Sequence, residues 1–273
     1  MPFRITLVVA ALAGLAPPVS AQNEPLPFVS NEWTFGRRTD EARLRFCVDA
    51  RDPEWQVARE IGEAVAGALL LEPVVHEITT GRNVEELDEL YGTMLEHCSV
   101  HMGFKLLPGA YPQWLTVTRP YYNAAYVFVT DNPEWDSLGE VPPGEPIAST
   151  MGTGADLRLI SYLLALPADE RWARFPMGTN AQTLEAVLDG VAPVALVWEP
   201  ALWAARNDDP AYDTLRVIGS DPLPETVEGI GAAVLAGETF LRTSLDQAIA
   251  ALSADGTIAE IIERHGLPAH VAQ

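Results

Sequence analysis

A polar, proline-fixed turn that runs directly into an apolar strand is the feature that most restricts the fold of this chain. The turn and the strand together cover residues 117–130, in the sequence VTRPYYNAAYVFVT. Pro120 fixes its own φ and disfavours helical backbone at Arg119, whereas residues 126–129 favour an extended run that is buried on both faces. The segment therefore predicts a buried strand, and it predicts that side chains of the preceding turn make contacts beyond the turn itself.

The first 21 residues have the pattern of a secretory signal peptide. Arg4 precedes an apolar stretch at 5–15, and small residues at 19–21 form the expected cleavage site. We expect a periplasmic mature chain of 252 residues, which is what remains of 273 after removal of 21. It would begin with an N-terminal arm, 22–42, to which we assign no function. The apolar stretch is shorter than the roughly 20 residues of a membrane-spanning helix, and no later segment approaches that length, so we expect no membrane insertion.

The mature chain is strongly acidic. Loss of Arg4 from the 17 basic residues leaves 16 against 38 acidic ones, a net charge of −22. This charge argues against binding to nucleic acid or to anionic membranes. Two interpretations stay open, an acidic solvated surface without a specific partner and a surface that meets a basic protein.

Strands and helices alternate in the first part of the mature chain. The expected strands are 44–48, 73–78 and 100–104, separated by a helix within 55–71 and by another that begins near Asn83. This order predicts a parallel sheet, with Cys47 on its first strand and Cys98 just before its third.

Cys47 and Cys98 are the only cysteines. In an exported chain two cysteines on neighbouring strands most simply form one disulfide. A metal site that uses the flanking His97 and His101 is the alternative, although two histidines are a small ligand set and a disulfide sulfur is not a thiolate ligand.

A second alternating pattern follows a connection rich in proline and glycine at 131–145. Its expected strands are 147–150, 194–198 and 215–218, and its expected helices are 156–166 and 180–188. Asp221-Pro222-Leu223-Pro224 marks a second crossing, after which a strand at 229–235 and helices at 239–252 and 257–265 complete the chain.

The turn sequence Thr118-Arg119-Pro120-Tyr121 resembles the Thr-x-Pro-Tyr motif of family 3 periplasmic solute-binding proteins. The resemblance implies an α/β, two-lobed type II periplasmic binding protein, in which each lobe is a mostly parallel sheet flanked by helices and the chain crosses a hinge twice. Lobe 1 would comprise 43–129 and 229–273, and lobe 2 with the hinge segments 130–228. The ligand would lie between the lobes.

Several residues are candidates for that ligand site. Gly152-Thr153-Gly154 opens a helix and offers backbone N–H groups to an anion, and a Gly-Thr pair at this place touches the ligand in the family; a tight turn with an N-cap is the alternative. Lys105 and Arg119 are either anion ligands or surface charges. The expected aromatic walls, which could instead be core, are Trp55, Phe104, Tyr121, Tyr122 and Trp198. Thr118 and Glu199 complete the candidate set.

The segment Val194 to Pro200 is similar to that of a narrower subgroup, the binding-protein-like components associated with quinoprotein dehydrogenases such as methanol dehydrogenase. This subgroup also has cysteines like Cys47 and Cys98 and a double tyrosine in its turn. A standard amino acid is an unfavourable ligand by this comparison. The chain lacks an arginine shortly before Thr118 that would clamp a carboxylate, and Pro193 replaces the usual acid that would hold an ammonium group.

Four functions are compatible with these resemblances. The chain is a non-enzymatic receptor that passes a small molecule to an ABC permease, or an accessory of a periplasmic quinoprotein dehydrogenase and its cytochrome c, and in both cases we expect a monomer without a cofactor. An amino-acid or polar-solute uptake receptor is the alternative. A periplasmic dehydratase on the same fold is a further one, with Glu199 as general acid.

Overall fold

A computed structural model describes residues 42–79, 87–107, 109 and 111–273. The signal peptide, its cleavage site, nearly all of the 22–42 arm and the start of the helix near Asn83 lie outside these residues. Within the described ranges, no helix combines the length and the apolar character needed to cross a membrane.

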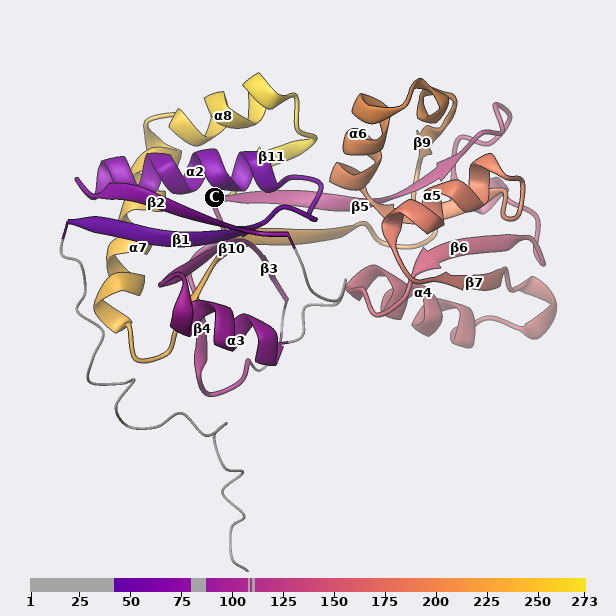
Figure 1. Cartoon of the computed structure of the whole chain (residues 1–273). Helices are drawn as coiled ribbons and strands as arrows, with labels where there is room; N and C mark the ends of the chain where they lie inside the picture. Colours follow the sequence, from indigo (N-terminus) through magenta and orange to yellow (C-terminus); the bar gives the residue numbers. More distant parts are fainter. Residues whose placement is uncertain (1–41, 80–86, 108, 110) are drawn as a thin grey trace, which may run out of the picture. The chain divides into compact units, whose positions relative to one another are not determined.

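Two alternating runs of strands and helices make up the described chain (Figure 1). The first run is β1 (Arg43–Asp49), α2 (Trp55–Ala68), β2 (Glu72–Ile78), α3 (Leu87–Glu96), β3 (Val100–Leu106), β4 (Leu115–Val117) and β5 (Tyr122–Thr130). The second is β6 (Pro146–Thr150), α4 (Gly154–Ala165), β7 (Ala173–Met177), α5 (Asn180–Leu188), β8 (Val194–Trp198), α6 (Glu199–Asp208) and β9 (Arg216–Ile218). The C-terminal part consists of β10 (Thr226–Leu235), α7 (Thr239–Ala254), α8 (Thr257–His265) and β11 (Ala269–Val271). Short 3-10 turns lie at Leu138–Glu140, Ala168–Glu170 and Pro210–Thr214.

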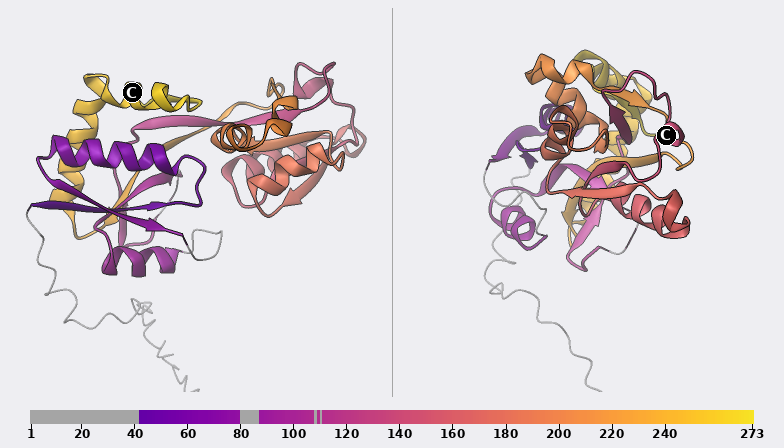
Figure 2. Two further views of the ribbon diagram at one scale, coloured as in Figure 1. Left: turned by 45° about the horizontal axis from the view of Figure 1, so that its top comes forward. Right: turned by 90° about the vertical axis from the view of Figure 1, so that its right-hand side faces the viewer.

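The strands form one mixed sheet in the order β2-β1-β3-β10-β5-β8-β6-β7. The ladders of β1 with β2 and β3 are parallel, and so are those of β6 with β7 and β8. Strands β5 and β10 join these two parallel blocks through antiparallel ladders, to each other and to β8 and β3. Figure 2 shows both strands running from one group of helices to the other. The sheet is therefore parallel where the alternating pattern predicted it, and antiparallel where the chain passes between blocks.

Helices cover both faces of the first block. Helix α2 packs on one face, where Val57, Ile61 and Val65 are buried in the large core together with Phe46 of β1. Helix α3 contributes Met94 to a separate core on the opposite face. This arrangement explains why α2 has apolar residues at helical spacing, since one stripe of the helix meets the sheet.

Two elements differ from the expectations from sequence. Strand β7 was not predicted because Pro176 interrupts it, but β7 is the last strand of the sheet order, and an edge strand tolerates a residue that cannot donate to a further ladder. Helix α6 was not predicted because Glu199-Pro200 suggested only the end of a strand. Proline suits the first turn of a helix, where its missing N–H is not needed, and α6 begins at this pair.

The predicted disulfide between Cys47 and Cys98 is confirmed, with Cα atoms 5.6 Å apart. Cys47 lies on β1, and the residue pairs of β1 with β3 bring Cys98 alongside it. Both cysteines are buried in the core under α3. No group of three or more His, Cys, Asp or Glu placed to hold a metal ion occurs in the described part of the chain.

Candidate functional site

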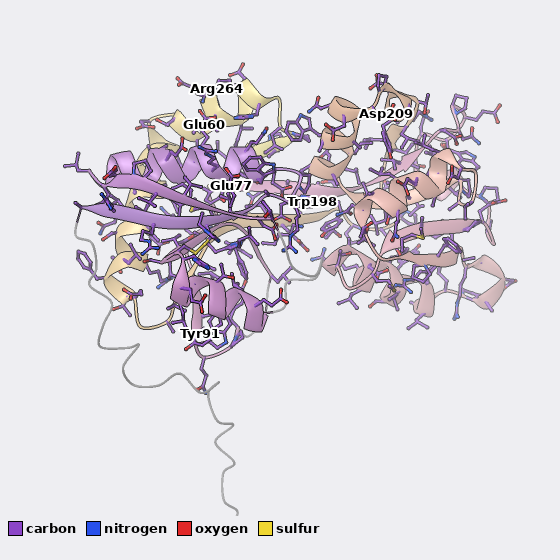
Figure 3. The ribbon with its side chains drawn as sticks, in the orientation of Figure 1. Glu60, Glu77, Tyr91, Trp198, Asp209 and Arg264 are labelled. Carbon is purple, nitrogen blue, oxygen red and sulfur yellow. A yellow bond between two sulfur atoms is a disulfide. The ribbon has the colours of Figure 1, made fainter. Side chains whose placement is uncertain are left out.

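A hydrogen bond between residues far apart in sequence marks the candidate site. The indole N–H of Trp198, the last residue of β8, donates to Oε1 of Glu54 at 2.9 Å. Glu54 precedes α2, 144 positions earlier, and the two residues are 2% and 0% exposed. The position of Trp198 is labelled in Figure 3. The pair links the β1–α2 connection to the β8–α6 connection.

Aromatic and cationic groups surround Trp198. Tyr126 is its register partner on β5, and the two rings lie 5.0 Å apart at an angle of 54°. The ammonium nitrogen of Lys105, on β3, lies 5.1 Å from the centroid of the Trp198 ring. A cation at this distance from an indole is attracted by the negative face of the ring.

The double tyrosine of the predicted turn is fully buried. The hydroxyl of Tyr121 accepts a hydrogen bond from the backbone N–H of Gly103 at 2.7 Å, and its ring lies 5.2 Å from that of Tyr122. The hydroxyl of Tyr122 is buried without a hydrogen-bond partner among the described residues. Tyr121 thus anchors the turn to β3, while Tyr122 retains an unused polar group.

Glu54 acts electrostatically on all three tyrosines. Burial is the main cause that raises the pKa of Tyr121, of Tyr122 and of Tyr126, the last to about 12, and the negative charge of Glu54 adds to each of these increases. One oxygen of Glu54, Oε2, is buried and has no hydrogen-bond partner in the described structure. Half of the carboxyl oxygens of Glu54 are therefore unsatisfied within the described structure.

The Gly152-Thr153 turn forms the other side of the candidate site. Gly152 has φ +80°, a left-handed conformation that favours glycine. Thr153 is the N-cap of α4, and its hydroxyl accepts from the N–H of Asp156 at 3.1 Å. Gly154 leaves room for Glu228, because a Cβ there would lie 2.6 Å from Glu228 Oε1.

An ion pair between the buried Asp156 and the partly buried Arg174 holds this turn in place. Arg174 of β7 donates two hydrogen bonds to Asp156, at 2.7 and 2.8 Å, and Ser149 donates a third at 2.7 Å. Burial acts to raise the pKa of Asp156, but the hydrogen bonds from Arg174 and Ser149 outweigh burial and hold this pKa below its usual value. Asp156 also accepts from the N–H of Gly152 at 3.3 Å. The backbone N–H of Gly152 is therefore directed at the protein's own acid.

The hydrogen bonds described for Arg119 and Thr118 are made to α7 and β10, and not to the residues around Trp198 or Asp156. The side chain of Arg119 is exposed, and its backbone N–H donates to Asp246 of α7 at 2.7 Å. The hydroxyl of Thr118 accepts from the N–H of Ala232 on β10 at 2.9 Å. The structure thus gives Thr118 a role in joining the turn to the sheet.

Three further candidates have distinct surroundings. Trp55 is partly buried against the large core. Phe104 is buried in the core beside the disulfide, with its ring 6.1 Å from those of His101 and Tyr111. Glu199 is half-buried at the start of α6, where burial raises its pKa.

The fold of this chain, rather than its sequence, is similar to those of known proteins. No family model matches the sequence, and no curated protein matches it either. Among solved structures, a histidine kinase sensor domain described as similar to periplasmic binding proteins has a TM-score of 0.63 at 16% identity, over 85% of this chain and 100% of the other. The GluR0 ligand-binding core in complex with L-glutamate has a TM-score of 0.62 at 14% identity, over 82% and 98%. An ancestral arginine-binding protein bound to arginine has a TM-score of 0.58 at 16% identity, over 82% and 97%.

The fold is that of the type II periplasmic binding proteins. The predicted fold class is thereby confirmed, and the structures of similar fold include amino-acid-binding proteins. The comparisons give no support to the narrower quinoprotein-associated subgroup.

Sequence reasoning did not include Glu54 or Glu228 among the candidate residues. An acid before an amphipathic helix suggests an ordinary N-cap, yet Glu54 makes no side-chain cap to α2. Glu228 is 6% exposed within β10, in a segment expected to be a crossing between blocks. A charged residue inside a run of strand-forming residues was the available signal for Glu228.

Proposed function

We propose that this chain is a non-enzymatic solute-binding receptor for a small, polar, amine-containing molecule. The single observation that carries the proposal is the Glu54–Trp198 hydrogen bond, because it brings buried polar groups from separate connections of a binding-protein fold to one place. In open α/β sheets, ligands bind beyond the carboxyl ends of strands, and Trp198 ends β8. The similarity to amino-acid-binding structures favours this function over the dehydrogenase-associated one.

The ligand site in this proposal is centred on Lys105, Thr153 and Trp198, with Gly152 and Tyr122 near it. Glu54, Tyr126 and Glu228 are added to it. Six further residues stay in the proposed set as supporting residues, because most of them already make contacts with other parts of the protein. They are Trp55, Phe104, Thr118, Arg119, Tyr121 and Glu199. Lobe 1 in the proposal comprises 43–129 with 229–273, and lobe 2 comprises 130–228.

The proposed physiological role is uptake. Export through segment 1–21 would place the chain beside an ABC permease, to which it passes its ligand after closing over it. A ligand that contacts both sides of the site favours the closed state by its differential affinity.

The decisive experiment is native mass spectrometry of protein purified from its own periplasm, followed by a thermal-shift screen of amino acids, amines and organic acids. A retained small molecule that also raises the melting temperature supports the receptor role. Ligand at about 100 times its dissociation constant adds about 2.7 kcal/mol to the free energy of unfolding. Protein that retains nothing and shifts with no compound in the screen contradicts the proposal.

A second candidate is an accessory of an exported quinoprotein dehydrogenase such as methanol dehydrogenase. The Cys47–Cys98 disulfide favours it, because it joins the two cysteines on which that resemblance rests. The net charge of −22 expected for the mature chain would give a salt-sensitive association with a basic partner. Pull-down from periplasmic extract at low and high salt tests this role, and recovery of neither a dehydrogenase nor a cytochrome c at low salt would exclude it.

A further inference from the structure

Three of the five histidines of this chain lie beside the Cys47–Cys98 disulfide. Cys47 on β1 is in register with His76 on β2 and with His101 on β3, and paired residues of neighbouring parallel strands point to the same face of a sheet. His97 directly precedes Cys98. The face of the first block that α3 covers therefore carries three side chains of the type that gains a proton in mild acid.

His76 and His97 are stacked on each other. Their ring centroids lie 4.3 Å apart, and the ring planes differ by 9°. His97 continues the last turn of α3, because its backbone N–H donates to the carbonyl of Thr93 at 2.8 Å. His76 belongs to β2, the first strand in the sheet order and hence an edge strand. The stack therefore joins the C-terminal end of α3 to the edge of the sheet.

The charges around the stack favour one proton on it and oppose a second. On α3, Glu96 Oε2 lies 3.7 Å from His97 Nε2, and the C-terminal end of a helix attracts positive charge. On β1, Arg45 contributes a positive charge, and on β3, His101 is buried. Burial is the main cause that lowers the pKa of His76, and the charges of His97 and Arg45 lower it further. His97 is thus the ring that is better placed to carry the first proton.

We propose that the His76–His97 stack is a pH-sensitive contact that releases the C-terminal end of α3 from β2 in mild acid. Two neutral imidazoles, or one neutral and one protonated, stay stacked, whereas two positive charges 4.3 Å apart repel each other. Separated rings bind the second proton more readily than stacked rings do. A fall in pH therefore favours the separated state. The contact is at full strength above the ordinary histidine pKa of about 6.5 and weakens as the pH falls below this value.

The disulfide keeps this release local. Cys98 follows His97 and is bonded to Cys47, and both cysteines are buried in the core to which Met94 of α3 contributes. The last turn of α3 can therefore leave β2 while the chain stays attached to β1 just before β3 begins. Release of this turn requires no ligand, so it is a property of the first block whether or not the chain is a receptor.

Hydrogen exchange of the mature chain tests the proposal, with rates corrected for the intrinsic effect of pH on amide exchange. Protection of the last turn of α3, measured relative to α2, should fall about 10-fold between pH 7 and pH 5. His76→Phe keeps a ring for stacking but cannot become charged, and it should remove most of this dependence. His270→Gln, at an exposed histidine, is the matched control and should leave the dependence unchanged.

A titration of the histidine ring protons by NMR gives a second readout that does not depend on unfolding. In His97→Phe, His76 should bind its proton at a higher pH than in wild-type protein, because the neighbouring charge has been removed. An unchanged titration of His76 would contradict the proposed coupling between the two rings.

The buried His101 is the competing cause of any acid effect on α3, since it lies on the same face of the sheet. Loss of the pH dependence in His101→Gln, together with its persistence in His76→Phe, would overturn the proposal. Equal protection of α3 at pH 7 and pH 5 in wild-type protein would overturn it as well. Persistence in His101→Gln and loss in His76→Phe would support it.

Discussion

Trp198 and Glu54 are joined by a 2.9 Å hydrogen bond although 144 positions separate them in the sequence. Both side chains are buried. The indole N–H is the one hydrogen-bond donor that the structure describes for the carboxyl group of Glu54. The pair is therefore a contact on which both stability and the proposed ligand site depend.

Trp198→Phe should lower the free energy of unfolding. The substitution keeps most of the ring but removes the N–H, which leaves a buried acid without its donor, and we expect a loss of about 1.5–3 kcal/mol. Chemical denaturation followed by far-UV circular dichroism measures it. Trp203→Phe, at a partly buried tryptophan of α6, is the matched control and should have a smaller effect. Equal losses in the two variants would show that the hydrogen bond contributes little.

The disulfide should contribute strongly to stability. Cys47 and Cys98 close a loop with a sequence separation of 51, for which the chain-entropy model gives about 4 kcal/mol. The free energy of unfolding of the double variant Cys47→Ala with Cys98→Ala should be lower by about this amount. Part of the loss would come from the changed packing in the core. Peptide mapping without reduction must recover the linked peptides from wild-type protein. Free thiols in periplasmically folded protein would contradict the pairing.

His101 should make the protein less stable in mild acid. Burial lowers the pKa of His101 to about 4, against an ordinary value of 6.5, with nearby Asp49 opposing and Arg51 adding to the effect. His101 of the unfolded chain therefore binds a proton below about pH 6.5, whereas His101 of the folded chain binds one only below about pH 4. The stabilisation is complete above about pH 6.5, is lost as the pH falls between these values, and amounts to at most about 3 kcal/mol.

Denaturation midpoints measured between pH 4 and pH 7.5 check this dependence. His101→Gln should flatten the curve in that window, whereas His270→Gln, at an exposed histidine, should leave its shape unchanged. A curve of the same steepness in wild type and His101→Gln would assign the pH dependence to other groups.

Removal of Arg174 should destabilise the second block of the sheet. Arg174→Ala leaves Asp156 buried at 2% exposure without its two charge-assisted hydrogen bonds, and we expect a loss of about 3 kcal/mol. Hydrogen exchange should be faster in α4 and β6 than in α2. Arg158→Ala removes an exposed arginine from the same helix as Asp156 and should change stability little. If Arg158→Ala costs as much, the ion pair has no special importance.

Much of the fold was predictable from local patterns. The apolar spacing of α2 and the alternation of strands and helices depend on residues near one another in sequence, and they predicted both parallel blocks and the Cys47–Cys98 disulfide. The Thr118 to Tyr121 turn likewise predicted a buried strand after it, and β5 is this strand, although it already begins at Tyr122. Strand β7 and helix α6 were missed because a proline, read locally, indicates the end of a strand or helix. A proline is nevertheless tolerated in an edge strand and in the first turn of a helix, and only the tertiary structure shows that these are the two cases here.

The candidate site was predicted less well, and the reason is the register of the sheet. Whether Tyr121 and Tyr122 face a ligand or fill the core depends on which strands lie beside them, and β3, β10 and β11 contribute from distant parts of the chain. The sequence alone determined the alternating elements, the acidic charge and the covalent link between β1 and the start of β3. Only the tertiary structure decided that Arg119 is exposed, that both tyrosines are buried, and that Glu54 meets Trp198, because these outcomes require strands separated by many residues to pack in one particular register.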